Sequence, residues 1–403
     1  MKLSSRLDAI KPSITLAVTS KAAALRRQGI DVIGFGAGEP DFDTPAHIRE
    51  AAKAAIDGGQ TRYTDVAGTP ELRKAVAKWL SAAHGLDLLP EHIVVSVGAK
   101  HSLFNLFFAL LDAGDEVLVP APYWVSYPEM VTFAGGTPVV VETTMARGLK
   151  ARAVDLEAKL TPRTRAVILC SPSNPTGAVY DKRELAELAE LCVARDLLVV
   201  SDDIYRSLVY GVPYCHLVNS VDGKLREQIR ARTILVDGVS KTYAMTGWRI
   251  GVMAGPTELA KAVSTIQGQS TSNASSVAQA AALAALEGPQ ACVDEMRAAF
   301  DERRKVMVER LRAIPGVECL APDGAFYVFP YLGAFAGRKT AAGKTLADDV
   351  QLSEYLLEAG RVAVVPGTGF GAPGFVRLSY ATSMAKIEEG LGRMREALLA
   401  LQK

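Results

Sequence analysis

Seven short apolar segments between residues 93 and 254 constrain the fold more than any other feature of this sequence. Each is mostly β-branched and apolar throughout rather than alternating, which is typical of strands covered on both faces. Helix-like stretches such as Ser102–Leu111 and the amphipathic Lys182–Arg195 lie between them. This alternation predicts an α/β fold with a mostly parallel seven-stranded sheet. The predicted strands are Ile93–Val97, Glu116–Pro120, Pro138–Glu142, Ala166–Leu169, Leu197–Ser201, Thr233–Val236 and Ile250–Ala254.

The pattern changes after about residue 295, and a second, smaller α+β layer is expected there. A charged helix is predicted around Asp301–Ala313, followed by strand-like segments at Ala325–Val328 and Val376–Tyr380. The last stretch, Met384–Leu401, has the spacing of one amphipathic helix. A chain of 403 residues exceeds a single compact core, so two domains are expected.

The charge balance narrows the classes of partner. Lys and Arg total 45 against 44 Asp and Glu, a net charge of +1, which argues against nucleic acid or an anionic membrane as partner. No run of about 18 apolar residues exists to span a membrane, and the start has no apolar segment typical of a signal peptide. A cytoplasmic protein is therefore predicted.

The five cysteines are scattered, form no CxxC pair and have no histidine in ligand spacing nearby. They are Cys170, Cys192, Cys215, Cys292 and Cys319. Neither a disulfide framework nor a zinc site is indicated, and no metal is expected.

The glycine-rich segment "VIGFGAGEPDF" invites a dinucleotide-binding interpretation, which fails on inspection. That fingerprint needs a third glycine that opens a helix. Glu39 stands at that position, and Pro40 with Pro45 prevents a helix from starting. What remains is a turn at Gly34, Gly36 and Gly38 that lets the backbone approach another group closely.

Two motifs follow predicted strands and could contact an anion or a ligand oxygen. In "VSVGAKHS" the strand passes through Ala99 and Lys100 into an apolar helix, whose unpaired N–H groups make an anion site; an ordinary strand–helix turn is the alternative. In "CSPSNPTG" two prolines stiffen a loop that holds Asn174 in a fixed direction, although the segment could be a simple turn.

Two further strand exits carry charged residues. In "VVSDDIY" a buried strand delivers Asp202 and then Tyr205; a carboxylate there is costly unless it meets a cation, and a helix N-cap is the alternative. In "GVSKTYAMTGWRIG" Lys241 follows an apolar strand and Arg249 comes eight residues later. Taken alone, this lysine could simply lie in solvent.

Parallel sheets gather such exits into one cleft. Lysine, asparagine, aspartate, tyrosine, arginine and an anion-binding turn are together what a pyridine aldehyde phosphate requires. In this order the sequence resembles the class I aminotransferases, the fold-type-I family that depends on pyridoxal 5′-phosphate (PLP). The match runs from Lys11 to Thr382 and includes "GAGEPDFDTP", "PYWVSYPEM", "SPSNPTGAVY", "SKTYAMTGWRIG" and "VRLSYATS". These motifs are similar to those of bacterial aspartate and aspartate/prephenate aminotransferases.

The resemblance implies an N-terminal arm over residues 1–14, a small domain over 15–44 and 296–403, and a large PLP-binding domain over 45–295. It makes Lys241 the imine-forming, proton-transferring residue and Asp202 the partner of the pyridine nitrogen. The other cofactor-binding residues that it implies are Ala99, Lys100, Trp124, Asn174, Tyr205, Arg249 and, from a neighbouring subunit, Tyr63. A homodimer with shared active sites is therefore expected.

The resemblance also implies how amino acids and 2-oxo acids bind. Arg377 would clamp the substrate α-carboxylate in a two-pronged pair. Lys100 with Thr15 would contact a distal carboxylate; holding phosphate is the alternative role of Lys100. The remaining substrate-binding residues are Gly38, Trp124, Asn174 and Lys11. The expected reaction is ping-pong transfer of the amino group from L-aspartate to 2-oxoglutarate, with prephenate as a further acceptor.

One position departs from the family pattern. Many relatives have a serine three residues before the lysine, where this chain has Gly238, and the role of the nearby Ser240 stays open. Three alternatives share part of the pattern: an aminotransferase of aromatic or alanine specificity, a PLP-dependent β-lyase or cyclase, and a non-catalytic regulator. The regulator would need a DNA-binding extension, for which the segment before the first motif is short.

Overall fold

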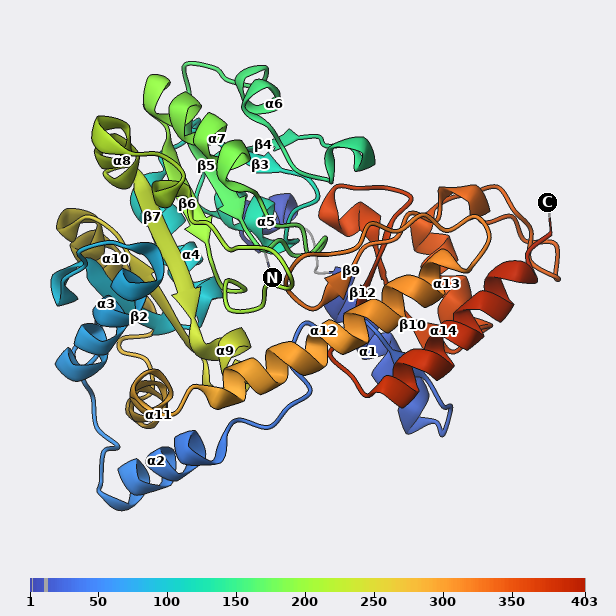
Figure 1. Ribbon diagram of the computed structural model, residues 1–403, viewed down its shortest axis with the longest axis horizontal. Coiled ribbons are helices and arrows are strands. Elements are labelled where there is room, and N and C mark those ends of the chain that lie inside the picture. Colours follow the sequence, from blue (N-terminus) through green and yellow to red (C-terminus); the bar gives the residue numbers. More distant parts are fainter. Residues whose placement is uncertain (2, 11–13, 403) are drawn as a thin grey trace.

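The computed structural model describes residues 1, 3–10 and 14–402 of the chain. Its largest sheet has seven strands in the order β2-β8-β7-β6-β5-β3-β4 (Figure 1). Strand β8 is antiparallel to its neighbours β2 and β7, and the remaining pairs are parallel. The strands are β2 (Ile93–Val97), β3 (Glu116–Pro120), β4 (Thr137–Val141), β5 (Thr164–Cys170), β6 (Leu198–Asp202), β7 (Thr233–Gly238) and β8 (Ile250–Ala254). The predicted α/β fold and all seven predicted strands are confirmed.

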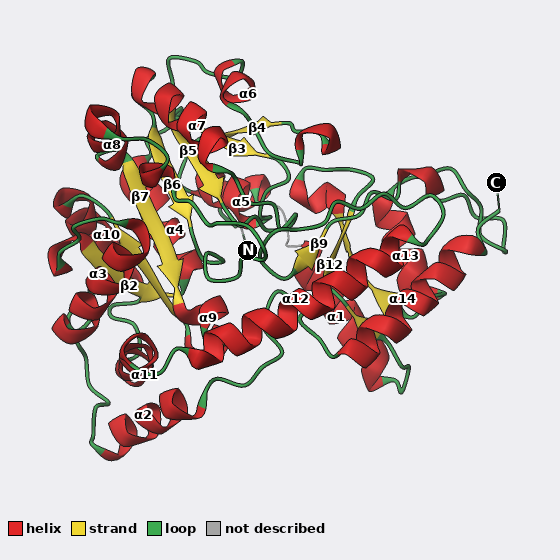
Figure 2. Ribbon diagram, viewed as in Figure 1, coloured by secondary structure: helices red, strands yellow, loops and turns green. Residues whose placement is uncertain are grey.

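Helices cover both faces of this sheet, which explains why its strands are apolar throughout (Figure 2). Consecutive residues Val199 and Val200 of β6 are both buried, in two separate cores. The α-helices of the described residues are α1 (Ile14–Arg27), α2 (Ala46–Asp57), α3 (Pro70–His84), α4 (Ala99–Leu110), α5 (Ser126–Phe133), α6 (Ala153–Glu157), α7 (Lys182–Ala194), α8 (Gly223–Arg230), α9 (Val239–Thr242), α10 (Thr257–Ser270), α11 (Ser276–Glu287), α12 (Ala291–Arg312), α13 (Asp349–Glu358) and α14 (Met384–Leu399).

Two small sheets lie beside the large one, at the end of α12 (Figure 1). Strand β11 (Val365–Pro366) and strand β9 (Tyr327–Val328) pair antiparallel with β12 (Val376–Ser379). Strand β1 (Ile33–Gly34) pairs parallel with β10 (Val362–Ala363), so an early segment of the chain joins a late one. The predicted domain boundaries agree with this pairing and stay a prediction.

Some element bounds differ from the sequence expectation. Helix α12 begins ten residues before the predicted Asp301, because Val293, Met296 and Phe300 continue its buried stripe through a highly charged segment. Ala325 adopts a left-handed conformation with φ +57°, so β9 begins only at Tyr327. Glu39 and Pro40 start no helix, as expected, and α2 begins at Ala46.

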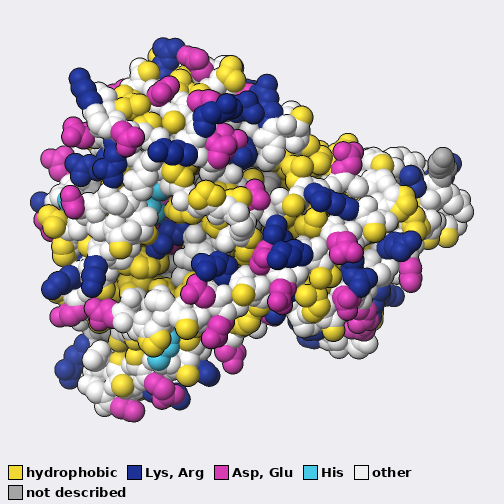
Figure 3. Space-filling model, in the orientation of Figure 1, with side chains coloured by type: hydrophobic (Ala, Val, Ile, Leu, Met, Phe, Trp, Pro, Cys, Tyr) yellow, Lys and Arg dark blue, Asp and Glu magenta, His cyan; other side chains and the backbone are white. Residues whose placement is uncertain are grey.

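The surface agrees with a nearly neutral chain. Acidic and basic side chains are interspersed over the face seen in Figure 3 rather than gathered by sign. Among the described residues no helix is both long and apolar enough to cross a membrane. All five cysteines are free.

Candidate active site

Lys241 lies where strand β7 passes into the short helix α9. Its Nζ donates a hydrogen bond to the carbonyl oxygen of Gly38 at 2.6 Å, so the glycine-rich turn does bring backbone close to another group. Burial lowers the pKa of Lys241 to about 8, the carboxylate of Glu39 opposes this, and the charges of Arg249 and Arg377 add to the lowering. A lysine that is partly neutral near pH 8 can take up a proton.

Asp202 stands at the end of β6, in the middle of the sheet, and is 4% exposed. Its Oδ2 accepts a hydrogen bond from the hydroxyl of Tyr127 at 2.6 Å, and its Oδ1 accepts one from the Ile204 amide at 3.3 Å. Burial raises the pKa of Asp202 to about 7, which the hydrogen bond from Tyr127 opposes. A buried carboxylate of this kind suits a cationic partner.

Arg377 of β12 reaches the same place from the small antiparallel sheet. It is 2% exposed, and it donates from Nη1 to Asn174 Oδ1 at 3.0 Å and from Nη2 to the carbonyl oxygen of Gly36 at 2.8 Å. Its guanidinium also lies over the ring of Tyr327. Since the Asn174 oxygen accepts from Arg377, the amide nitrogen of Asn174 is left to donate to a ligand.

The turn before α4 is built around Arg249, whose backbone is left-handed with φ +57°. The guanidinium covers Gly98 so closely that an added Cβ there would lie 2.3 Å from Nη2. At Gly251 an added Cβ would lie 1.9 Å from the Ala99 nitrogen, so two glycines let β8 touch the start of α4. No side chain in the described part of the chain caps this helix, which leaves its first N–H groups available to an anion.

Ten of the predicted residues line one cavity of about 320 Å³. They are Gly38, Ala99, Lys100, Trp124, Asn174, Asp202, Tyr205, Lys241, Arg249 and Arg377. Four of them are cationic and only Asp202 is anionic, so the cavity favours an anionic ligand. The Arg377 Nε is buried without a partner, and no carboxylate of the described residues forms an ion pair with this side chain. The donor set therefore fits a ligand that carries phosphate and carboxylate groups.

The remaining three predicted residues are Tyr63, Thr15 and Lys11. Tyr63 is 91% exposed and is not one of the residues that line the cavity. Thr15 belongs to α1, and its side chain is outside the described part of the chain. Lys11 also lies outside the described residues.

Sequence reasoning missed two tyrosines. Tyr127 holds Asp202, and the hydroxyl of Tyr327 is 2.8 Å from that of Tyr205. Tyr127 lies in the motif "PYWVSY", from which only Trp124 was assigned to the site. Tyr327 has the sequence context of a core residue in a short strand. Ser240, whose role stayed open, also lines the cavity.

Gly238 has a structural reason for departing from the serine of many relatives. An added Cβ would lie 2.9 Å from the Ile250 carbonyl oxygen and 3.0 Å from the Gly251 Cα, both backbone atoms. A side chain at Gly238 therefore requires β7 and β8 to move apart.

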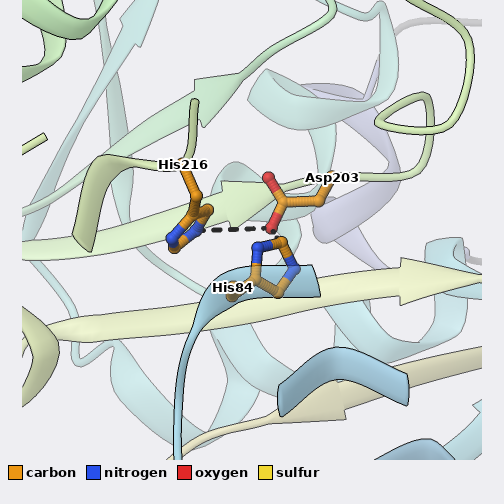
Figure 4. Close-up of side chains that lie close together, drawn as sticks. All are labelled: His84, Asp203 and His216. Carbon is orange, nitrogen blue, oxygen red and sulfur yellow. Dashed lines mark ion pairs between the residues drawn. The ribbon is translucent and has the colours of Figure 1, made fainter. Parts of the chain in front are cut away.

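A second buried cluster consists of His84, Asp203 and His216 (Figure 4). His84 Nε2 and His216 Nε2 are 3.7 and 3.5 Å from Asp203 Oδ2, in the arrangement of a possible metal site. However, the Nδ1 of His216 accepts a hydrogen bond from the Val218 amide, so in the neutral ring Nε2 carries the proton. This contact argues against a metal site, because a metal-bound histidine normally donates from its other nitrogen. Asp203 is held instead through its Oδ1, which accepts hydrogen bonds from the hydroxyls of Ser201 and Tyr214, whereas its Oδ2 has no hydrogen-bond partner among the described residues.

Comparisons with known proteins agree with the geometry of the cavity. The model of the family "Aminotransferase class I and II" matches residues 30–394. A probable aspartate/prephenate aminotransferase of Aquifex aeolicus is 48% identical over 98% of both chains, and an aspartate aminotransferase of Geobacillus stearothermophilus is 47% identical over 99% of this chain and all of its own.

Solved structures give the same result. The aspartate aminotransferase of Rhizobium meliloti superposes over the whole of both chains with a TM-score of 0.95 and 43% identity. That of Thermus thermophilus, solved with maleate, superposes over 98% of this chain and all of its own, with a TM-score of 0.92 and 45% identity. With the family model matching most of its length, this chain belongs to the class I and II aminotransferases.

Proposed function

We propose that this enzyme is an aspartate aminotransferase that uses PLP to move the amino group of L-aspartate to 2-oxoglutarate. One observation carries the proposal: Arg377 is buried in the same cavity as Lys241, without a carboxylate partner among the described residues. A guanidinium in that position suits the α-carboxylate of an amino acid, which it can hold by two parallel hydrogen bonds.

The residues of the cavity fit the parts of the cofactor separately. The start of α4 at Ala99 and Lys100, with Arg249, offers amides and positive charge for a phosphate. Tyr205 and the free amide nitrogen of Asn174 offer donors for a phenolic oxygen, and Asp202 offers a carboxylate for a cationic ring nitrogen. When bound, PLP supplies a ring that accepts the electrons released as a proton leaves the substrate.

Lys241 is the residue that moves the proton. Its Nζ, with a pKa near 8, is neutral in part of the enzyme at neutral to alkaline pH. It lies on the same side of the cavity as Gly38, where Arg377 also binds the neighbouring carbonyl oxygen of Gly36. A substrate held by Arg377 therefore presents its Cα to a positioned general base.

The substrate range follows from the excess of positive charge. Lys100, whose Nζ lies 4.9 Å from the centre of the Trp124 ring, lines the same cavity and offers a positive charge for a second carboxylate. The relative from Thermus thermophilus was solved with maleate, a dicarboxylate with four carbons, which supports the same preference here. Prephenate, also a dicarboxylate, is a further acceptor under this proposal, as the names of several relatives suggest.

The proposal includes a homodimer in the cytoplasm. Tyr63 is a large aromatic residue with 91% of its surface exposed, and we assign it to the phosphate site of a neighbouring subunit. The division into an arm (1–14), a small domain (15–44 and 296–403) and a large domain (45–295) belongs to the same proposal. All five free cysteines are consistent with a reducing compartment.

A spectroscopic experiment tests the proposal. L-Aspartate added to the yellow holoenzyme should bleach the cofactor band, and 2-oxoglutarate should restore it; prephenate should do the same. Bleaching by L-phenylalanine or L-alanine but not by L-aspartate would point to another specificity. Release of pyruvate and ammonia without a second substrate would instead identify a β-lyase.

A further inference from the structure

Tyr127 connects two parts of the cavity. Its hydroxyl donates to Asp202 Oδ2 at 2.6 Å, and its ring packs edge-on against Trp124 with ring centroids 5.3 Å apart. The side chain is 2% exposed and belongs to α5, whereas Asp202 ends β6. A short bond between two buried groups from separate elements fixes both of them.

Asp202 has little else to stabilise its charge. Of the described side chains only Tyr127 donates to it, and the Ile204 amide adds a longer bond at 3.3 Å. Two buried carboxylates raise its proton affinity further. The titratable groups that face Asp202 are Tyr127 on α5, Cys170 on β5, Asp203 next to it, Asp237 on β7 and Lys241 on α9.

We propose that Tyr127 is a positioning residue, whose hydroxyl keeps Asp202 ionised and aimed into the cavity. The inference rests on the proposed function, because Asp202 must be charged to hold a cationic ring nitrogen. Tyr127 itself transfers no proton in this scheme. It acts through the carboxylate, as the donor that offsets part of the cost of burial.

Removing this donor has a defined consequence. Tyr127→Phe leaves the Asp202 carboxylate buried with one weak amide donor, so its pKa should rise by about one unit or more, the equivalent of a lost hydrogen bond to a charged group. As pH falls, Asp202 then becomes neutral earlier and releases the cofactor earlier. The pH midpoint of cofactor retention should therefore shift upward by about one unit.

The experiment uses the holoenzyme throughout. Wild-type enzyme and Tyr127→Phe are passed over a desalting column at a series of pH values, and the bound cofactor is read from its absorption. Tyr180→Phe is the matched control, because Tyr180 is also buried and its hydroxyl binds the Ala151 amide at 2.9 Å, away from Asp202. Thermal unfolding at each pH separates cofactor release from loss of fold.

Two further variants complete the test. With Asp202→Asn the residue cannot ionise, so adding Tyr127→Phe to it should cause no further pH shift. Tyr127→His, which retains a donor, should lie between wild type and Tyr127→Phe, and it provides a second measurement if Tyr127→Phe does not fold.

The outcomes are separable. An upward shift in Tyr127→Phe that is absent from Tyr180→Phe and from the Asp202→Asn background supports the inference. If wild-type enzyme reacts with L-aspartate but Tyr127→Phe keeps the wild-type midpoint, the role of Tyr127 is wrong and the proposed function stands. If wild-type enzyme binds no PLP or does not react with L-aspartate, the proposed function itself fails.

Discussion

The Nζ of Lys241 and the carbonyl oxygen of Gly38 are 2.6 Å apart although 203 residues separate them in the chain. Lys241 follows strand β7 of the large sheet, whereas Gly38 belongs to the turn after β1 in the small parallel sheet. This hydrogen bond therefore joins the large sheet to the segment that also holds Arg377 through Gly36. The residues proposed to transfer the proton and to bind the carboxylate are therefore held by the same short turn.

Lys241→Ala should reduce turnover by about 10²- to 10⁴-fold, the contribution of a positioned general base. The same variant should lose the site of covalent labelling. Steady-state kinetics measure the turnover, and borohydride reduction of the holoenzyme followed by peptide mapping locates the label, which should lie on Lys241 in the wild type. A label on another lysine, or an unchanged rate in the variant, would contradict the assigned role.

Arg377→Lys should lower kcat/KM for L-aspartate by about 10- to 100-fold, although the positive charge is retained. An ammonium group cannot make two parallel hydrogen bonds, and it leaves Asn174 and Gly36 short of a donor. Steady-state kinetics over a range of aspartate concentrations measure kcat/KM for the variant and the wild type. A variant with wild-type kcat/KM would show that the α-carboxylate binds elsewhere.

Lys100→Ala separates the two roles left open for Lys100. If this side chain contacts the distal carboxylate, kcat/KM should fall about tenfold or more for L-aspartate and little for L-alanine. Kinetics with both amino acids at saturating cofactor check this. An equal loss for the two substrates would instead indicate that Lys100 serves the phosphate alone.

A mixture of two inactive variants should regain activity if the sites are shared between subunits. In a hybrid of Tyr63→Ala and Lys241→Ala subunits, one of the two sites has both native residues, so up to half of its sites are restored. Mixing after mild denaturation and refolding, followed by the aspartate assay, provides the measurement. If mass measurement shows that hybrid dimers have formed but no activity returns, Tyr63 acts within its own chain or has no role in the site.

His216→Gln should make the protein less sensitive to acid. Burial lowers the pKa of His216 to about 3, so below pH 6.5 the unfolded chain takes up a proton that the folded chain does not, and stability is lost as pH falls toward 3. Between pH 8 and pH 5, the free energy of unfolding should therefore fall by about 2 kcal/mol less in the variant than in the wild type. Urea unfolding at both pH values measures the difference, with His47→Gln as control; equal losses in variant and wild type would exclude the effect.

The strands could be predicted from the sequence because burial on both faces leaves a run of β-branched residues that little else produces. The start of α12 could not be predicted from the sequence, because its buried apolar residues alternate with charged residues such as Asp294 and Arg297. The site residues at strand exits were predictable because parallel strands gather their ends. Tyr127 could not be predicted, because its importance comes from a hydrogen bond to Asp202, a residue 75 positions away in the sequence.

Histidines illustrate the same limit. The spacing of residues 84, 203 and 216 gives no motif, and only the fold brings them within reach of one another. The position of the proton on the His216 ring depends on a further contact, the hydrogen bond from the Val218 amide, which no pattern of residue types could reveal.

The contact of Gly251 with the start of α4 restricts how this enzyme can change. Any substituent on that Cα meets the Ala99 nitrogen at 1.9 Å, so even alanine must displace the start of α4, whose amides are proposed to bind phosphate. Saturation libraries at this codon should return glycine alone among active clones. Most surface positions can accept substitutions one at a time, whereas a substitution at Gly251 requires simultaneous changes in the turn before α4.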